Sequence, residues 1–212
     1  MRKDQNKKNI ARKISKSLHI NEFLLNFPFF YAPLLNILRK DYGFAMDFGK
    51  IELVDKIIKK YPVTSFVETG TYRGDTAHFM ARKYPDLPIY TCEIDEKFWK
   101  IATRRLKNYR NAKAIIGDSV TSLKRHSLSF GDFPLFFLDA HAMFNWREPN
   151  PLMEELKAIK ENFKNARVIV DDVETDNCPN INKIEEIKKY FKNCQLIKHS
   201  PPAESGYVLG II

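Results

Sequence analysis

The sequence predicts an α/β protein: a seven-stranded, mostly parallel sheet with an antiparallel pair of strands at its C-terminal end, helices on both faces and a helical extension at the N-terminus. From position 50 onward, apolar runs of strand length alternate with longer amphipathic segments, which is the pattern of βαβ units. The last two apolar runs are joined by a connection too short to hold a crossover helix, so they should pair antiparallel. The chain has 212 residues, of which 44% are hydrophobic, enough to bury one core.

The individual elements follow from local patterns, taken in chain order. Apolar residues at helical spacing between Ile51 and Ile58 predict a helix that packs on the sheet. Pro151 suits the first turn of a later helix, whose apolar face includes Leu152 and Leu156. The expected strands are 65–68, 89–93, 112–116, 135–138, 167–170, 195–198 and 206–212, and the expected helices between them are 76–83, 96–108, 120–125, 151–162 and 181–191.

The N-terminal part differs in composition, so we expect residues 1–49 to form a basic arm and a helical cap, and residues 50–212 to form the main domain. Lysine and arginine crowd the first 16 positions, where Asp4 is the one opposing acid. Such an arm can bind nucleic acid or an anionic membrane surface, or it can be a solvated terminus. The aromatic segment 23–42 predicts one or two helices, which either cover the mouth of a site, extend the core or form a homodimer face.

Composition also narrows the class of protein. The formal net charge is +9, and the three cysteines, Cys92, Cys178 and Cys194, form no CxxC pair. This argues against a zinc knuckle and a disulfide framework, and it favours a reducing compartment. The most apolar early stretch, 23–38, is interrupted by Asn and Pro and falls short of the ~20 residues that a spanning helix needs. We therefore expect a soluble, cytoplasmic protein without a transmembrane segment.

The most informative motif is residues 66–76, FVETGTYRGDT, where a strand ends in an acid and runs through two glycines into a helix. Glycine lets the backbone turn tightly, and the helix that follows presents free amides and a positive dipole end. The dinucleotide fingerprint GxGxxG is absent, because Gly70 and Gly74 are four positions apart. Glu68 directly precedes the loop, which suits a cationic or amino-bearing ligand. An ordinary strand-to-helix turn is the alternative.

Two further strands end in polar residues. Glu93 ends the second strand, where an acid can accept hydrogen bonds from ribose hydroxyls, and Asp95 is expected to cap the next helix. The third strand closes in residues 115–119, IIGDS. Asp118 can accept a hydrogen bond from an exocyclic amine, and Ser119 can donate to a ring nitrogen or cap the following helix.

The fourth and fifth signals are residues 136–141, FFLDAH, and 168–173, VIVDDV. At the carboxyl edge of a parallel sheet, Asp139, Asp171 and Asp172 should converge on one crevice. Gathered carboxylates repel one another unless a cation sits between them, and magnesium prefers such oxygen ligands. Alternatively, Asp139 contacts only a cofactor and the Asp171–Asp172 pair caps a loop.

The motif ExGxYxGxT resembles the first motif of class I S-adenosylmethionine (SAM) methyltransferases, particularly the catechol O-methyltransferase group. The resemblance implies a Rossmann-like fold in which Glu93 holds the ribose and the third strand end contacts the adenine. The acids at the last two strand ends are similar to the metal ligands of catechol-type and of macrolide and aminocoumarin sugar O-methyltransferases, which implies divalent metal at Asp139, Asp171 and Asp172. The methionine part of the cofactor would be surrounded by Glu68, Gly70, Tyr72, Gly74 and Thr76.

The sequence departs from the catechol enzymes at the general base. Those enzymes place a lysine shortly after the first metal aspartate, whereas this chain continues with residues 142–144, AMF. His141 is the nearest titratable group and suits proton transfer, although it can instead contact the adenosine. The later acidic residue that grips a catechol in those enzymes also has no match in this chain, so catechol is not the expected acceptor. Trp146 and Arg147 can bind an anionic or sugar-like acceptor, or only cover the site.

The function these motifs predict is SAM-dependent methyl transfer to a hydroxyl of a small molecule or sugar, with the acceptor activated by magnesium and Asp139 and His141 as catalytic residues. One alternative is a metal-free nucleic acid methyltransferase whose basic arm holds phosphate. A second alternative is a non-catalytic protein that keeps the fold and binds the cofactor, since fold does not determine function.

Overall fold

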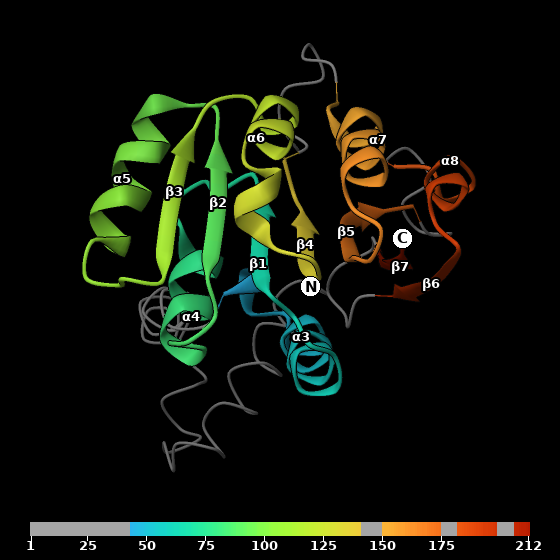
Figure 1. Cartoon of the computed structure of the whole chain (residues 1–212), viewed down its shortest axis with the longest axis horizontal. Helices are drawn as coiled ribbons and strands as arrows, with labels where there is room; N and C mark the ends of the chain where they lie inside the picture. The colour runs from blue at the N-terminus through green and yellow to red at the C-terminus, as the bar shows by residue number, and fades with distance from the viewer. Residues whose placement is uncertain (1–42, 141–149, 175–181, 199–205) are drawn as a thin grey trace, which may run out of the picture.

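A single seven-stranded sheet organises the chain, and its strand order is β3-β2-β1-β4-β5-β7-β6. The structure, a computed structural model, describes residues 43–140, 150–174, 182–198 and 206–212. β1 to β5 are parallel, and β7 runs antiparallel to both of its neighbours, β5 and β6 (Figure 1). The strands are β1 (Ser65–Thr69), β2 (Ile89–Glu93), β3 (Ala112–Ile116), β4 (Pro134–Leu138), β5 (Arg167–Val173), β6 (Asn193–Lys198) and β7 (Gly206–Ile211).

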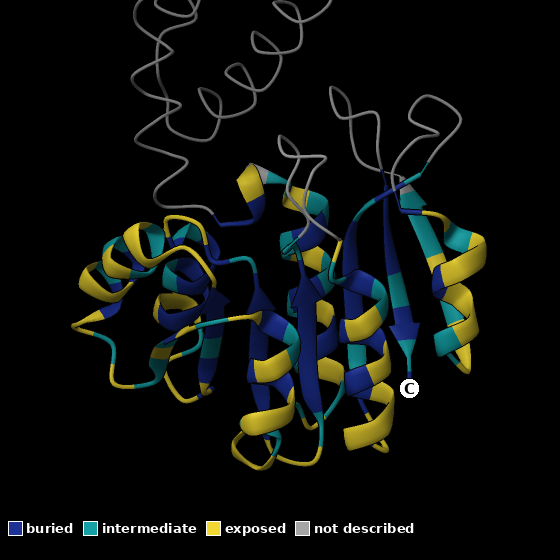
Figure 2. Ribbon diagram, turned by 90° about the horizontal axis from the view of Figure 1, so that it is seen from above, coloured by how far each residue is buried: buried dark blue, intermediate teal, exposed yellow. Residues whose placement is uncertain are grey.

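Helices cover both faces of the sheet. Successive side chains of a strand point to opposite faces, and in the central strands the side chains on both faces are apolar. One core cluster joins Phe66 and Phe137 to η2 (Phe44–Met46), α3 (Phe48–Lys60), α4 (Asp75–Lys83) and α5 (Glu96–Leu106). The other joins Val67 and Phe136 to α6 (Ser119–Arg125), η3 (Ser127–Phe130), α7 (Leu152–Asn162) and α8 (Ile184–Ile187), which is followed by η4 (Lys188–Tyr190). Figure 2 shows the buried strands enclosed by helices whose outer sides are exposed. Burial on both faces is typical of parallel sheets.

This architecture confirms the predicted fold class, and most predicted strands begin or end within two residues of the observed ones. Two elements differ. β5 continues to Val173, so Asp171 and Asp172 lie inside the strand, at a bulge where its pairing with β7 shifts and Asp172 adopts a φ of +47°. The predicted helix 181–191 is reduced to α8 and η4, because the chain turns into β6 there and the Phe191 ring lies directly over Gly210 of β7.

The short segment before α3 is part of the core. Phe44 is 2% exposed, and its ring makes edge-on contacts with Phe66, Phe79 and Phe137 at centroid distances of 5.0–6.2 Å. The basic arm, the predicted helices of 23–42 and the dimer face proposed for them lie outside the described residues. Within the described ranges, no helix combines the length and apolarity that a membrane span requires.

Candidate active site

The strand ends named by the sequence meet at one edge of the sheet. Backbone hydrogen bonds continue the strand pairing into the loops: Gly70 N donates to Cys92 O (3.0 Å), Gly117 N to Glu93 O (2.8 Å) and Asp139 N to Thr69 O (3.1 Å). The tips of β1, β2, β3 and β4 are thus held side by side. This is the edge at which open α/β sheets bind ligands.

The loop after β1 requires glycine at two positions. Gly70 has a φ of +81°, and a Cβ placed there would lie 2.3 Å from the carbonyl oxygen of Asp139. Gly74 has a φ of +74° and is the N-cap of α4. Both conformations are ones that side chains with a Cβ rarely adopt. The two glycines therefore bring the first motif against the tip of β4 and start α4 directly behind the loop.

Glu68 is buried beneath this loop, with 2% of its surface exposed. Its carboxylate accepts a hydrogen bond from Thr91 Oγ1 at 2.6 Å, and Thr76 also interacts with it. Burial raises the pKa of Glu68 to about 8, an effect to which the nearby charges of Asp75 and Glu93 add and which the two threonine hydrogen bonds oppose. A neutral buried acid of this kind would gain its charge if a cationic group bound beside it.

Glu93 lies next to the same loop and holds its backbone. Oε2 of Glu93 accepts from the amide of Tyr72 at 2.7 Å, and Oε1 accepts from the amide of Asp95 at 2.9 Å. Each carboxylate oxygen can accept a further hydrogen bond, so Glu93 keeps capacity for a diol. Tyr72, with a φ of +49°, is 56% exposed and its ring packs against Phe98 at 4.5 Å. Glu68 and Glu93 therefore border one loop.

The structure shows which residues cap the N-termini of α5 and α6. Asp95 is the N-cap of α5 and accepts from the amides of Lys97 and Phe98, as expected. Asp118 is the N-cap of α6 and accepts from Thr121 N at 2.7 Å, so the alternative that Ser119 caps this helix is wrong. Ser119 is instead the first residue of α6 and is 8% exposed. The exposed Asp118 retains a second carboxylate oxygen for an amine donor.

The three aspartates do not assemble into a metal-binding group. Among the described residues, which include all three, no group of three or more His, Cys, Asp or Glu side chains is placed to hold a metal ion. Asp171 forms a buried ion pair with Lys50 of α3, and its other oxygen accepts from the amide of Asp172 at 2.9 Å. Asp139 is half-buried at the tip of β4 beside Gly70. The donor set at Asp171 thus does not fit a divalent ion.

Sequence reasoning missed Lys50 and Thr91. Lys50 shares the buried stripe of α3 with Val54 and Ile57, at a spacing of four and then three residues. A lysine on the apolar face of a helix indicates that a buried acidic side chain elsewhere in the chain pairs with it. Thr91 lies in an apolar strand, where its role as the partner of Glu68 depends on the strand register. The predicted residues His141, Trp146 and Arg147 lie outside the described residues.

A cavity of about 600 Å³ lies elsewhere, beside the amino ends of β5 and β6. It is lined in part by Lys160, Lys164, Tyr190 and Lys192. Because the polar strand ends are at the opposite edge of the sheet, this cavity is not the site that the motifs describe.

The chain resembles known proteins in its structure, whereas its sequence matches no protein-family model and no curated protein. Among solved structures, the O-methyltransferase from Bacillus cereus in complex with S-adenosylhomocysteine (SAH) matches over 99% of this chain and 99% of its own, with 13% identity and a TM-score of 0.63. A SAM-dependent methyltransferase from Aquifex aeolicus matches over 74% of this chain and 88% of its own, with 14% identity and a TM-score of 0.52.

Several matched proteins are longer than this chain. The CurJ carbon methyltransferase matches over 79% of this chain but 54% of its own length, with 12% identity and a TM-score of 0.57, and the chain spans 57% and 40% of two others. At such identities the likeness shows the fold: a class I methyltransferase, Rossmann-like fold. Proteins named for oxygen and for carbon methylation share it, so the fold leaves the acceptor atom open.

Proposed function

We propose that this chain is a SAM-dependent methyltransferase that acts on a hydroxyl of a small molecule or sugar. The observation that carries the proposal is the pair of buried acids, Glu68 and Glu93, on either side of the glycine loop at the carboxyl edge of the sheet. SAM carries a cationic methionine part and a ribose diol, the two groups that these acids suit. The fold, shared with proteins named as methyltransferases, supports the same cofactor.

Each residue would have a distinct task. Glu93 would accept hydrogen bonds from the ribose, since its oxygens keep lone pairs after binding the Tyr72 and Asp95 amides. Glu68 would ionise against the cationic methionine part. Asp118 and Ser119 would contact the adenine. When bound, SAM supplies an electrophilic methyl group, and the protein's contribution is to hold the acceptor oxygen in line with it.

The acceptor side of the proposal rests on fewer groups. Asp139, at the tip of β4 against Gly70, borders the site and would orient the acceptor, and His141 remains the proposed base. Oxygen as the acceptor atom is supported by the motif resemblance to O-methyltransferases. Magnesium has no role in this proposal, because the Asp171 carboxylate is already paired with the Lys50 ammonium.

Calorimetric titration with SAM and SAH tests the cofactor assignment. We expect both to bind the wild-type chain, and Glu93→Ala to weaken binding by about 1–3 kcal/mol, the usual cost of losing a charge-assisted hydrogen bond. Glu96→Ala is the matched control, because Glu96 is an exposed acid at the start of α5 that pairs with Lys100 in solvent. Absence of SAM and SAH binding to a folded wild-type chain would refute the proposal.

A further inference from the structure

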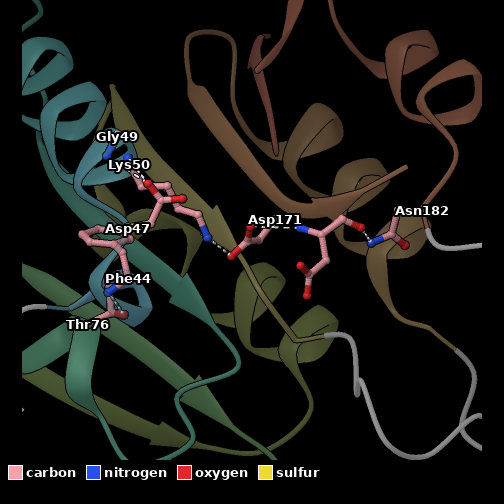
Figure 3. A network of polar contacts seen from close by, with 8 residues as sticks. Phe44, Asp47, Gly49, Lys50, Thr76, Asp171 and Asn182 are labelled. Carbon is pink, nitrogen blue, oxygen red and sulfur yellow. Dashed lines mark hydrogen bonds and ion pairs between the residues drawn. The ribbon is translucent and has the colours of Figure 1, made fainter. Parts of the chain in front are cut away.

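A buried ion pair links α3 to β5 beside the proposed site. Nζ of Lys50 donates to Oδ2 of Asp171, and the two side chains are 5% and 8% exposed. Figure 3 shows the lysine reaching from α3 toward Asp171. The second oxygen of Asp171 accepts from the amide of Asp172, whose carbonyl in turn accepts from Asn182 at 3.0 Å. Both oxygens of Asp171 therefore have protein donors, and one donor is a full positive charge.

The ammonium is held in place by its surroundings. Asp47 caps α3 and accepts from the amides of Gly49 and Lys50, which fixes the helix start at this point. The Lys50 ammonium lies 5.6 Å from the ring centre of Phe137 and 5.9 Å from that of Tyr207, distances at which an aromatic ring attracts a cation. The side chain is thus packed between rings as well as paired.

Helix-terminal preferences do not explain a lysine in the first turn of α3. A cation in the first turn of a helix opposes the helix dipole, and the carboxylate of Asp47 at this helix start is engaged with the amides of Gly49 and Lys50. Burying an ammonium is costly unless it is paired. The compensation comes from Asp171, so the position of Lys50 makes sense as part of this site.

A divalent ion at Asp171 would compete with Lys50 for this carboxylate. A magnesium ion bound to Asp171 would sit within a few ångströms of the ammonium, and like charges at that distance repel strongly where water is excluded. The ion would have to displace Lys50 from a position where rings surround it. The ammonium of Lys50 already neutralises the charge of the Asp171 carboxylate.

We propose that Lys50 is a positioning residue whose ammonium takes the place of a divalent cation at Asp171, so that methyl transfer by this chain needs no metal. The proposal rests on the proposed function for its catalytic part. Its electrostatic part, that Lys50 excludes metal from Asp171, stands on the ion pair alone. The two parts are tested by separate measurements.

Titration of the full chain with Mn²⁺, followed by electron paramagnetic resonance, tests the electrostatic part. We expect the wild-type chain and Asp171→Asn to bind Mn²⁺ equally, because the wild-type Asp171 carboxylate is already paired with Lys50. Lys50→Ala should gain Mn²⁺ binding at least about tenfold tighter than any the wild type shows, because the Asp171 carboxylate loses the repelling ammonium. Lys56→Ala is the matched control, since Lys56 lies on the same helix in an exposed pair with Glu52, and it should behave as the wild type.

Wild-type Mn²⁺ binding that depends on Asp171 would overturn the proposal, and so would a folded Lys50→Ala that binds Mn²⁺ no better than the wild type. Should Lys50→Ala fail to fold, Lys50→Met, which keeps an apolar side chain between the two rings and removes the charge, takes its place in the same titration. These readouts do not involve SAM, so they hold whether or not the proposed function is correct.

Methyl transfer to a panel of hydroxylated acceptors tests the catalytic part. With EDTA present we expect wild-type turnover to stay within about twofold, because no metal-bound acceptor has to form. Lys50→Arg, which keeps the charge, should retain more turnover than Lys50→Met at similar SAM affinity. Loss of turnover in EDTA that magnesium restores would overturn this part, whereas a wild-type chain that binds no SAM would refute the proposed function instead.

Discussion

At the scale of single residues, the site combines groups that a strand pattern can locate with groups that only the fold brings together. The positions of Glu68, Glu93 and Asp118 at the strand tips could be predicted, because each follows an apolar run and precedes a glycine or a helix start. Their roles toward a cofactor stay predictions. The Lys50–Asp171 pair could not be predicted, because its members are 121 positions apart and a lysine early in a helix usually points into solvent. Ser119 shows a local limit, because two adjacent residues could each cap α6 and the structure places Asp118 there.

Glu68 makes a pH-dependent contribution to stability. Its pKa rises from 4.5 to about 8 on folding, so between these values the folded chain holds a proton that the unfolded chain has released. The contribution is complete below pH 4.5 and is lost as the pH rises through 8. Glu68→Gln removes this titration and keeps an acceptor for Thr91, so between pH 5.5 and 8.5 the wild type should lose on the order of 3 kcal/mol relative to it.

Urea unfolding of both proteins at the two pH values measures this difference. Glu96→Gln, at an exposed position, serves as the control and should follow the wild type at both pH values. Parallel pH dependence of wild type and Glu68→Gln would mean that Glu68 ionises in the folded chain as it does in the unfolded one.

At the scale of elements, periodicity predicted the strands and long helices because burial on one or two faces leaves a strong pattern. It did not predict element boundaries that depend on contacts between residues far apart in the sequence. The bulge at Asp171 continues β5 through two acids, which a strand rarely includes, and the Phe191 contact with Gly210 cuts the last helix short. η2 is a similar case, since Phe44 and Ala45 both adopt positive φ values.

The η2 segment should be important to stability in spite of its length. Phe44→Ala removes a fully buried ring that contacts three other phenylalanines, and we expect it to lower the free energy of unfolding by about 3–5 kcal/mol. Leu128→Ala, at a residue that is 98% exposed, should change it by no more than about 0.5 kcal/mol. Denaturant unfolding of the two variants compares them directly, and equal small losses would show that Phe44 is not part of the core.

At the scale of the whole molecule, the seven-stranded sheet with its antiparallel last pair and its helices on both faces could be predicted, because βαβ connections allow few arrangements. The strand order is a finding of the structure. The acceptor could not be predicted, since its contacts depend on loops whose sequence carries no periodic signal. A cofactor that bridges the tips of β1, β2 and β3 should nevertheless stabilise the entire domain.

Thermal unfolding with SAH measures that coupling. At a concentration of about 100 times its Kd, SAH should add about 2.7 kcal/mol to the free energy of unfolding and raise the Tm by about 5–10 °C. Glu93→Ala at the same concentration should show a smaller shift. An unchanged Tm for the wild type at saturating SAH would contradict binding to the folded state.

The ion pair between α3 and β5 also has a consequence for biosynthesis. Lys50 and Asp171 are separated by 121 positions, so at ~5–20 residues per second the ribosome delivers the aspartate on the order of 10 s after the lysine. Throughout that interval the ammonium must remain hydrated, and α3 cannot dock in its final place. The first α-helix in the described part of the chain is therefore among the last to reach its final packing, once β5 has been synthesised.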